Sequence, residues 1–167
     1  HPLPSKVIHR HTKLRYRWEG IDETGKISRR WIETTAGRVM LRRMFADGDR
    51  VMVIGHSMGS VIAYDALWEL WHVEQNPGRI DLFLSLGSPL GMRFVQERLL
   101  GFRDAAGRRF PGNIRRWKNA AARGDLTALD PLLKNDFAPM VEQGLTESIE
   151  DIHDDLYTYF RNQDGLN

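Results

Sequence analysis

The chain has 167 residues, of which 41% are hydrophobic, enough for one domain with a substantial core. Its formal net charge is only +2, so composition gives no reason to expect nucleic-acid binding, although basic residues dominate residues 1–50 and acidic residues dominate residues 130–167. The absence of cysteine excludes disulfides and thiolate metal sites, and no apolar run is long enough to predict a membrane-spanning helix.

The first segment has the pattern of a β-hairpin. Apolar and polar side chains alternate over residues 8–18, which predicts a half-exposed strand. Residues 20–26 supply turn-forming side chains, and residues 26–32 are expected to return as the second strand.

A helix and then a strand–turn–helix unit are predicted next. Thr34 and Thr35 can cap a helix that runs to about Phe45. An apolar run rich in Val and Ile leads into Gly-His-Ser-Met-Gly at residues 55–59, and the apolar segment up to Trp71 predicts a buried helix. This order of elements is the one in which a Gly-x-Ser-x-Gly turn presents a nucleophilic serine.

Strands and helices are expected to alternate beyond this turn. That alternation predicts an α/β fold, a mostly parallel sheet with helices on both faces, within a single domain over residues 1–167. The loop over residues 101–112 carries arginines and paired alanines, which favours a plain surface loop over a mobile lid. The expected strands are residues 80–86, 114–118 and 140–145, and the expected helical segments are residues 93–100, a turn from Pro131, and residues 154–160.

Ser57 is the candidate nucleophile. A serine at the tip of such a turn has a strained backbone, so small residues are needed two positions before and after it, and Gly55 and Gly59 occupy those places. The backbone N–H of Met58 is expected to point into the same space, where it would form one half of an oxyanion hole.

These residues resemble the α/β-hydrolase superfamily, and within it the lipase/esterase-like bacterial hydrolases that carry Gly-His-Ser-Met-Gly-Ser at the nucleophile elbow. The resemblance extends from about Ile32 to Phe160. It implies an α/β-hydrolase-like fold that is apparently shortened at the N-terminus, because no motif for the second oxyanion donor precedes the elbow. Beyond the elbow, the matching segments are Leu-Gly-Ser-Pro-Leu-Gly at 86–91, Trp-Lys-Asn at 117–119 and Ile-His-Asp at 152–154.

The resemblance also implies a catalytic triad in the chain order nucleophile, acid, base. His153 lies late in the chain and is the expected general base, which would take the proton of Ser57 and return it to the leaving group. Asp125 is the expected acid that orients His153. Asp130 is the alternative, although as the residue before Pro131 it also fits a helix N-cap.

Three residues are expected to line the substrate pocket: His56 within the elbow, and Ser88 and Pro89 after the strand predicted at 80–86. Tyr64 is expected in the core.

The implied function is hydrolysis of a small-molecule carboxylic ester through an acyl-enzyme on Ser57, with no cofactor and no metal. We expect a cytoplasmic protein that neither inserts stably into membranes nor binds nucleic acid, of unknown oligomeric state. Two alternatives stay open: a non-catalytic binding module on a degraded hydrolase fold, and an acyltransferase with the same triad.

Overall fold

The structure, a computed structural model, describes residues 29–104, 106–122 and 130–153, with side chains described from residue 35 to residue 152. By its internal contacts the chain divides into residues 1–32 and residues 33–167, and almost all described residues belong to the second unit. The strand predicted at 8–18 and the helix predicted at 154–160 lie outside the described residues. In chain order the elements are α1 (Arg29–Ala46), β1 (Met52–His56), α2 (Met58–His72), β2 (Leu82–Leu86), a 3-10 turn (Pro89–Gly91), α3 (Arg93–Gln96), β3 (Arg116–Ala121), α4 (Leu133–Asp136), α5 (Ala138–Glu142) and β4 (Ser148–His153).

The four strands form one sheet in the order β1-β2-β3-β4, and every neighbouring pair is parallel. The sequence-based prediction of a parallel α/β sheet is therefore confirmed. One row of the register joins Gly55, Ser85, Asn119 and Asp151 across all four strands. The carboxyl ends of the strands consequently meet at one edge of the sheet, and the serine turn lies at that edge.

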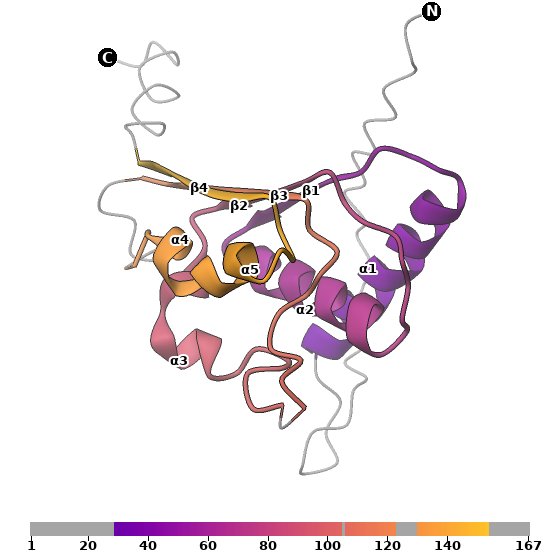
Figure 1. The fold of residues 1–167 in the computed structure, drawn as a ribbon, viewed down its shortest axis with the longest axis horizontal. Coiled ribbons are helices and arrows are strands. Elements are labelled where there is room, and N and C mark those ends of the chain that lie inside the picture. The colour runs from indigo at the N-terminus through magenta and orange to yellow at the C-terminus, as the bar shows by residue number, and fades with distance from the viewer. Residues whose placement is uncertain (1–28, 105, 123–129, 154–167) are drawn as a thin grey trace, which may run out of the picture. The chain divides into compact units, whose positions relative to one another are not determined.

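The described helices lie on one face of the sheet (Figure 1). The prediction of helices on both faces also involves the helix expected at 154–160, which lies outside the described residues. The strand order explains the placement of the described helices. Parallel crossovers are almost always right-handed, and three crossovers that each step to the next strand in the same direction place their helices on the same side. α1 packs against α2 on this side, where Arg38 forms ion pairs with Glu69 and Glu74 at 3.1 and 3.0 Å.

The other face of the sheet is open among the described residues. Met52 and Ile54 of β1 point to this face and are 55% and 54% exposed. On β3 and β4 the same face carries the ion pair between Lys118 and Glu150 at 3.2 Å. The open face is thus apolar over β1 and β2 and partly charged over β3 and β4.

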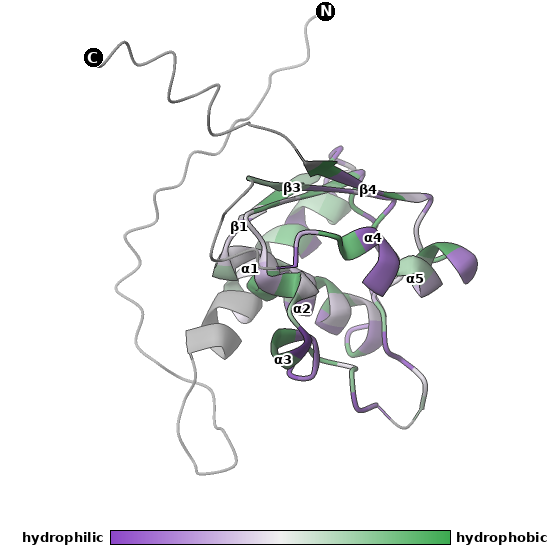
Figure 2. Ribbon diagram, turned by 90° about the vertical axis from the view of Figure 1, so that its left-hand side faces the viewer, coloured by the Kyte–Doolittle hydropathy of each residue, from purple (hydrophilic) through white to green (hydrophobic). Residues whose placement is uncertain are grey.

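The core lies between the covered face of the sheet and the helices. Trp117 is fully buried at its centre, and its ring lies 4.8 Å from Phe137, 5.2 Å from Phe83 and 5.9 Å from Tyr64, measured between centroids. Coloured by hydropathy, the helices change between hydrophobic and hydrophilic residues along their length, as expected for helices with one buried side (Figure 2).

Three predicted elements differ from the structure. Residues 29–32, expected in a strand, are helical. They form the first turn of α1, which begins before Thr34 and Thr35, the residues expected to cap it. The helix predicted over residues 93–100 ends at Gln96. Residues 140–145, expected as the last strand, belong to α5 and the turn after it, and Pro139 in the first turn of α5 favours that helix start. The last described strand is β4.

Candidate active site

The predicted elbow is present. β1 ends at His56, Ser57 follows as the single residue of the turn, and α2 begins at Met58. Ser57 has φ 50° and ψ −126°, so it is a non-glycine residue with positive φ. Such a backbone conformation costs on the order of 1–3 kcal/mol and persists only where the surrounding structure holds it, which is frequent at active sites.

The two glycines of the motif have different roles. A Cβ atom on Gly55 would lie 2.6 Å from the Cα of Ser60 and 2.9 Å from its N, so only glycine lets β1 approach the first turn of α2. A Cβ atom on Gly59 would meet nothing within 4 Å. The expectation that both positions must be small is therefore confirmed for Gly55 and wrong for Gly59, whose Cβ position faces open space.

The elbow is fixed by hydrogen bonds from two directions. The N–H of Ser57 donates to the carbonyl of Leu86 at 2.9 Å, which joins the turn to β2. The hydroxyl of Ser60 donates to the carbonyl of Ser57 at 2.6 Å and also lies 2.7 Å from the hydroxyl of Ser88. The Ser88 hydroxyl in turn accepts the N–H of Leu90 at 3.2 Å.

The side chain of Ser57 is left available for chemistry. Its hydroxyl does not cap α2, and it forms no hydrogen bond with any described residue. The residue is partly exposed. The N–H of Met58 belongs to the first turn of α2, where N–H groups have no acceptor within the helix, and the helix dipole favours negative charge at this end.

The residues expected to line the substrate pocket lie in different surroundings. His56 is exposed and occupies the open face of the sheet, opposite in register to Leu86. Ser88 is 2% exposed and Pro89 is also buried. The Ser88 hydroxyl is engaged with Ser60 and Leu90, so in this structure it holds the turn after β2 in place rather than facing a cavity.

His153 is the last residue of β4 and pairs in register with Ala121. It therefore lies at the same edge of the sheet as Ser57 but three strands away, because β2 and β3 separate β1 from β4. With neighbouring strands spaced about 4.8 Å apart, the two backbones are separated by roughly 14 Å. The side chain of His153 lies outside the described residues.

The two candidate acids are Asp125 and Asp130. Asp125 lies outside the described residues. Asp130 is exposed, and its carboxylate accepts the N–H of Leu132 at 3.3 Å. The N-cap residue of α4 is Leu132, so the expectation of a helix N-cap at Asp130 is wrong, and its carboxylate stabilises only the turn before the helix.

A third carboxylate, which sequence reasoning missed, belongs to Asp151 on β4. It accepts the amide of Asn119 at 3.0 Å and the N–H groups of Leu133 at 3.0 Å and Lys134 at 2.9 Å. Asp151 thus holds the start of α4 against the sheet. Asn119 continues this link, because its carbonyl oxygen accepts the hydroxyl of Ser85 at 2.8 Å on β2.

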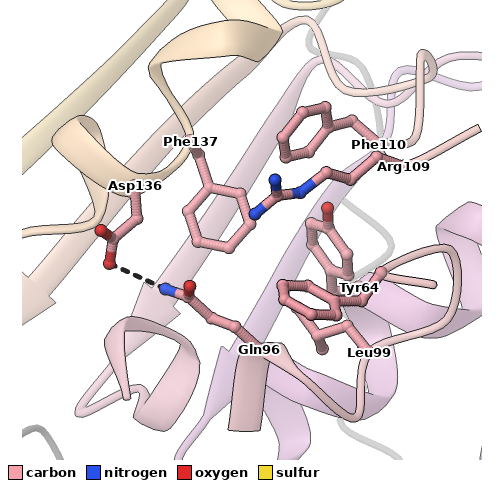
Figure 3. Close-up of a pocket in the computed structure, with 8 residues that line it drawn as sticks. Tyr64, Gln96, Leu99, Arg109, Phe110, Asp136 and Phe137 are labelled. Carbon is pink, nitrogen blue, oxygen red and sulfur yellow. Dashed lines mark hydrogen bonds between the residues drawn. The ribbon is translucent and has the colours of Figure 1, made fainter. Parts of the chain in front are cut away.

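The structure also contains cavities, and Ser57 lines none of the three described. A small cavity of about 10 Å³, room for about one water molecule, lies beside Tyr64 (Figure 3). A larger one of about 590 Å³ adjoins it, and both are lined by Gln96, Phe102, Arg109 and Asp136. Sequence reasoning assigned none of these four residues to a site. The third cavity, of about 310 Å³, is lined by Glu97, Arg98 and Arg103.

No protein-family model and no solved structure matches this chain. Within the described ranges, no group of three or more His, Cys, Asp or Glu side chains is arranged to hold a metal ion. Over the same residues, no helix has both the length and the apolar character that crossing a membrane requires.

Proposed function

We propose that this chain is a serine hydrolase that cleaves carboxylic esters. Ser57 attacks the ester carbonyl, the N–H of Met58 stabilises the resulting oxyanion, and expulsion of the alcohol leaves an acyl-enzyme that water hydrolyses. His153 acts as general base and then as general acid, and Asp125 orients it. Esters, rather than amides or thioesters, follow from the resemblance to the lipase/esterase-like hydrolases, since a fold does not fix a substrate.

The observation that carries this proposal is the backbone of Ser57. A serine with φ 50° between a parallel strand and a helix is held there by contacts that use its N–H and carbonyl but not its hydroxyl. Residues with such strained backbones cluster at active sites. The α2 N-terminus and the Met58 N–H supply the electrostatic environment that a developing oxyanion requires.

The assignment of His153 as base depends on a side chain that lies outside the described residues. Because β4 stands three strands from β1, the imidazole has to extend along the carboxyl edge of the sheet toward Ser57. Of the histidines with described side chains, His72 does not compete for the role of base, because its ring bonds to the carbonyl of Phe110 at 2.8 Å.

The test is labelling with a fluorophosphonate probe, which reacts with an activated serine and requires no knowledge of the substrate. We expect wild type to be labelled, Ser57→Ala not to be labelled, and His153→Ala and Asp125→Ala to be labelled at least tenfold more slowly. Ser148→Ala is the matched control, since this serine lies at the opposite end of the sheet in β4 and should leave labelling unchanged. Wild type that is folded but not labelled would contradict the proposal.

A second candidate is a binding module that retains the hydrolase-like elbow without catalysis. The separation of β1 from β4 by two strands favours it, because the hydroxyl of Ser57 forms no hydrogen bond with any described residue. The two candidates differ in the labelling rate of His153→Ala relative to wild type. An equal rate in both proteins shows that His153 does not activate Ser57 and favours the binding module.

A further inference from the structure

The larger cavity has the size and the mixed lining of a small-molecule site. At about 590 Å³ it falls within the usual range of roughly 300–1,000 Å³ for ligand pockets. Apolar side chains from Met92, Phe94 and Phe102 contribute to its wall, and Phe94 is 57% exposed. One wall is fixed, because the Gln96 amide donates to the carbonyl of Leu90 at 3.0 Å and to the carboxylate of Asp136 at 2.7 Å.

Arg109 presents an available positive charge at the junction of the two cavities. Its guanidinium carbon lies 5.0 Å from the ring centroids of both Phe102 and Phe110, so two aromatic rings hold the group in position. Among the described residues no carboxylate forms an ion pair with it. The adjacent Arg108, by contrast, pairs with Asp104 at 2.8 Å.

A second donor lies next to this guanidinium. Tyr64 is 1% exposed, and its hydroxyl group points toward Arg109 in the small cavity (Figure 3). No hydrogen-bond partner for that hydroxyl exists among the described residues. Burial raises the pKa of Tyr64 far above its ordinary value, a shift only partly opposed by the charge of Arg109, so the phenol keeps its proton at neutral pH. An O–H donor and a guanidinium thus converge on one space.

Convergent donors of this kind recognise an oxyanion. The remaining charged side chains around the larger cavity decide whether it carries one negative charge or two. Arg93 also lines the larger cavity, but it pairs with Glu97 at 3.1 Å, whereas the carboxylates of Asp136 and Asp130 on the same wall oppose a second negative charge. We propose that this cavity binds a small organic monoanion, a carboxylate attached to an apolar body. The carboxylate pairs with Arg109 where the two cavities adjoin, with the Tyr64 hydroxyl behind it in the small cavity, and the apolar body lies against Phe94 and Phe102. The site is separate from the elbow and does not depend on the hydrolase proposal.

The experiment is an NMR titration of the full chain with 4-phenylbutyrate, with 4-phenylbutanol as the neutral analogue and phenyl phosphate as the dianion. We expect 4-phenylbutyrate to shift the amide signals of residues 92–96 and 109–110 and to bind at least tenfold more tightly than the other two. A hydrogen bond to a charged group contributes about 1.5–3 kcal/mol, so Arg109→Met should weaken binding of the carboxylate by about ten- to a hundredfold.

Two further variants complete the test. Tyr64→Phe keeps the buried ring and should weaken binding severalfold. Arg116→Met removes the same charge from an exposed position on β3 and should leave binding unchanged. The proposal is overturned if 4-phenylbutanol or phenyl phosphate binds as tightly as the carboxylate, if Arg109→Met binds it like wild type, or if no probe shifts these signals. Ser57→Ala should bind as wild type does.

Discussion

The hydroxyl groups of Ser60 and Ser88 lie 2.7 Å apart and join the first turn of α2 to the turn that follows β2. Both residues are buried. The same Ser60 hydroxyl donates to the carbonyl of Ser57. The contact between Ser60 and Ser88 therefore helps to hold the strained backbone of Ser57 in place. The rigidity of the candidate nucleophile therefore depends on a side chain that is 31 residues away in sequence, since 88 minus 57 is 31.

Ser88→Ala tests this support. It removes one partner of the Ser60 hydroxyl and leaves the buried N–H of Leu90 without its acceptor, so we expect the free energy of unfolding to fall by about 1–3 kcal/mol. Urea denaturation measures the change. Ser148→Ala, on the partly exposed end of β4, should stay within about 0.5 kcal/mol of wild type. Equal stability of Ser88→Ala and wild type would show that the contact contributes nothing.

Replacement by alanine should have opposite effects on stability at the two glycines of the elbow motif. Gly55→Ala forces a Cβ atom against the backbone of Ser60, so we expect a loss of at least about 2 kcal/mol in stability and the loss of fluorophosphonate labelling. Gly59→Ala places a methyl group in open space on a helix and should raise stability by about 0.5–1 kcal/mol. Thermal unfolding and labelling, run on both variants together, measure the pair. A destabilised Gly59→Ala would contradict the geometry.

Replacement of Ser57 separates backbone strain from chemistry. Ser57→Ala and Ser57→Gly both remove the hydroxyl and should both abolish labelling. Only glycine adopts φ 50° without a Cβ clash, so we expect Ser57→Gly to be more stable than Ser57→Ala by about 1 kcal/mol. Chemical denaturation gives this difference, and the opposite order would show that the turn holds no strain.

Tyr64 should make stability depend on alkaline pH. Its pKa is about 10 in the unfolded chain and is raised in the folded protein, so the neutral phenol stabilises the fold below about pH 10. Above that pH the unfolded chain releases a proton that the folded chain keeps, and stability falls by about 1.4 kcal/mol per pH unit. Tyr64→Phe lacks this term, so its unfolding free energy should decline less steeply between about pH 10 and 11.5. Parallel slopes would refute the assignment.

The elbow could be predicted from the sequence because its signals are local. A Val- and Ile-rich run, a Gly-x-Ser-x-Gly turn and an apolar helix fall within residues 51–72, and the structure has a strand, a single-residue turn and a helix there. The wrong prediction of a strand at residues 140–145, where the structure has the end of α5 and a turn, has a local cause as well. Met140 and Val141 suit either element, and Pro139 was the better signal.

What the sequence could not predict depends on contacts between distant segments. Tyr64 was expected in the core and is buried there, but its aromatic pattern gives no indication that its hydroxyl faces Arg109, 45 residues later, since 109 minus 64 is 45. Asp151 has no motif of its own, and its role follows only from the approach of α4 to β4. Strand order in the sheet, and with it the separation of His153 from Ser57, is likewise a property of the whole fold.

The strands stand in the sheet in the order in which they are synthesised. Each new strand can therefore pair with the one made just before it as soon as it leaves the ribosome, with no need to wait for later sequence. The turn that carries Ser57 is complete before β3 exists, and β4 is the last of the described strands to be added. A nascent chain stalled after β3 would carry a formed serine turn and an unpaired β3 edge, and that edge is where misassembly with a neighbouring chain is to be expected.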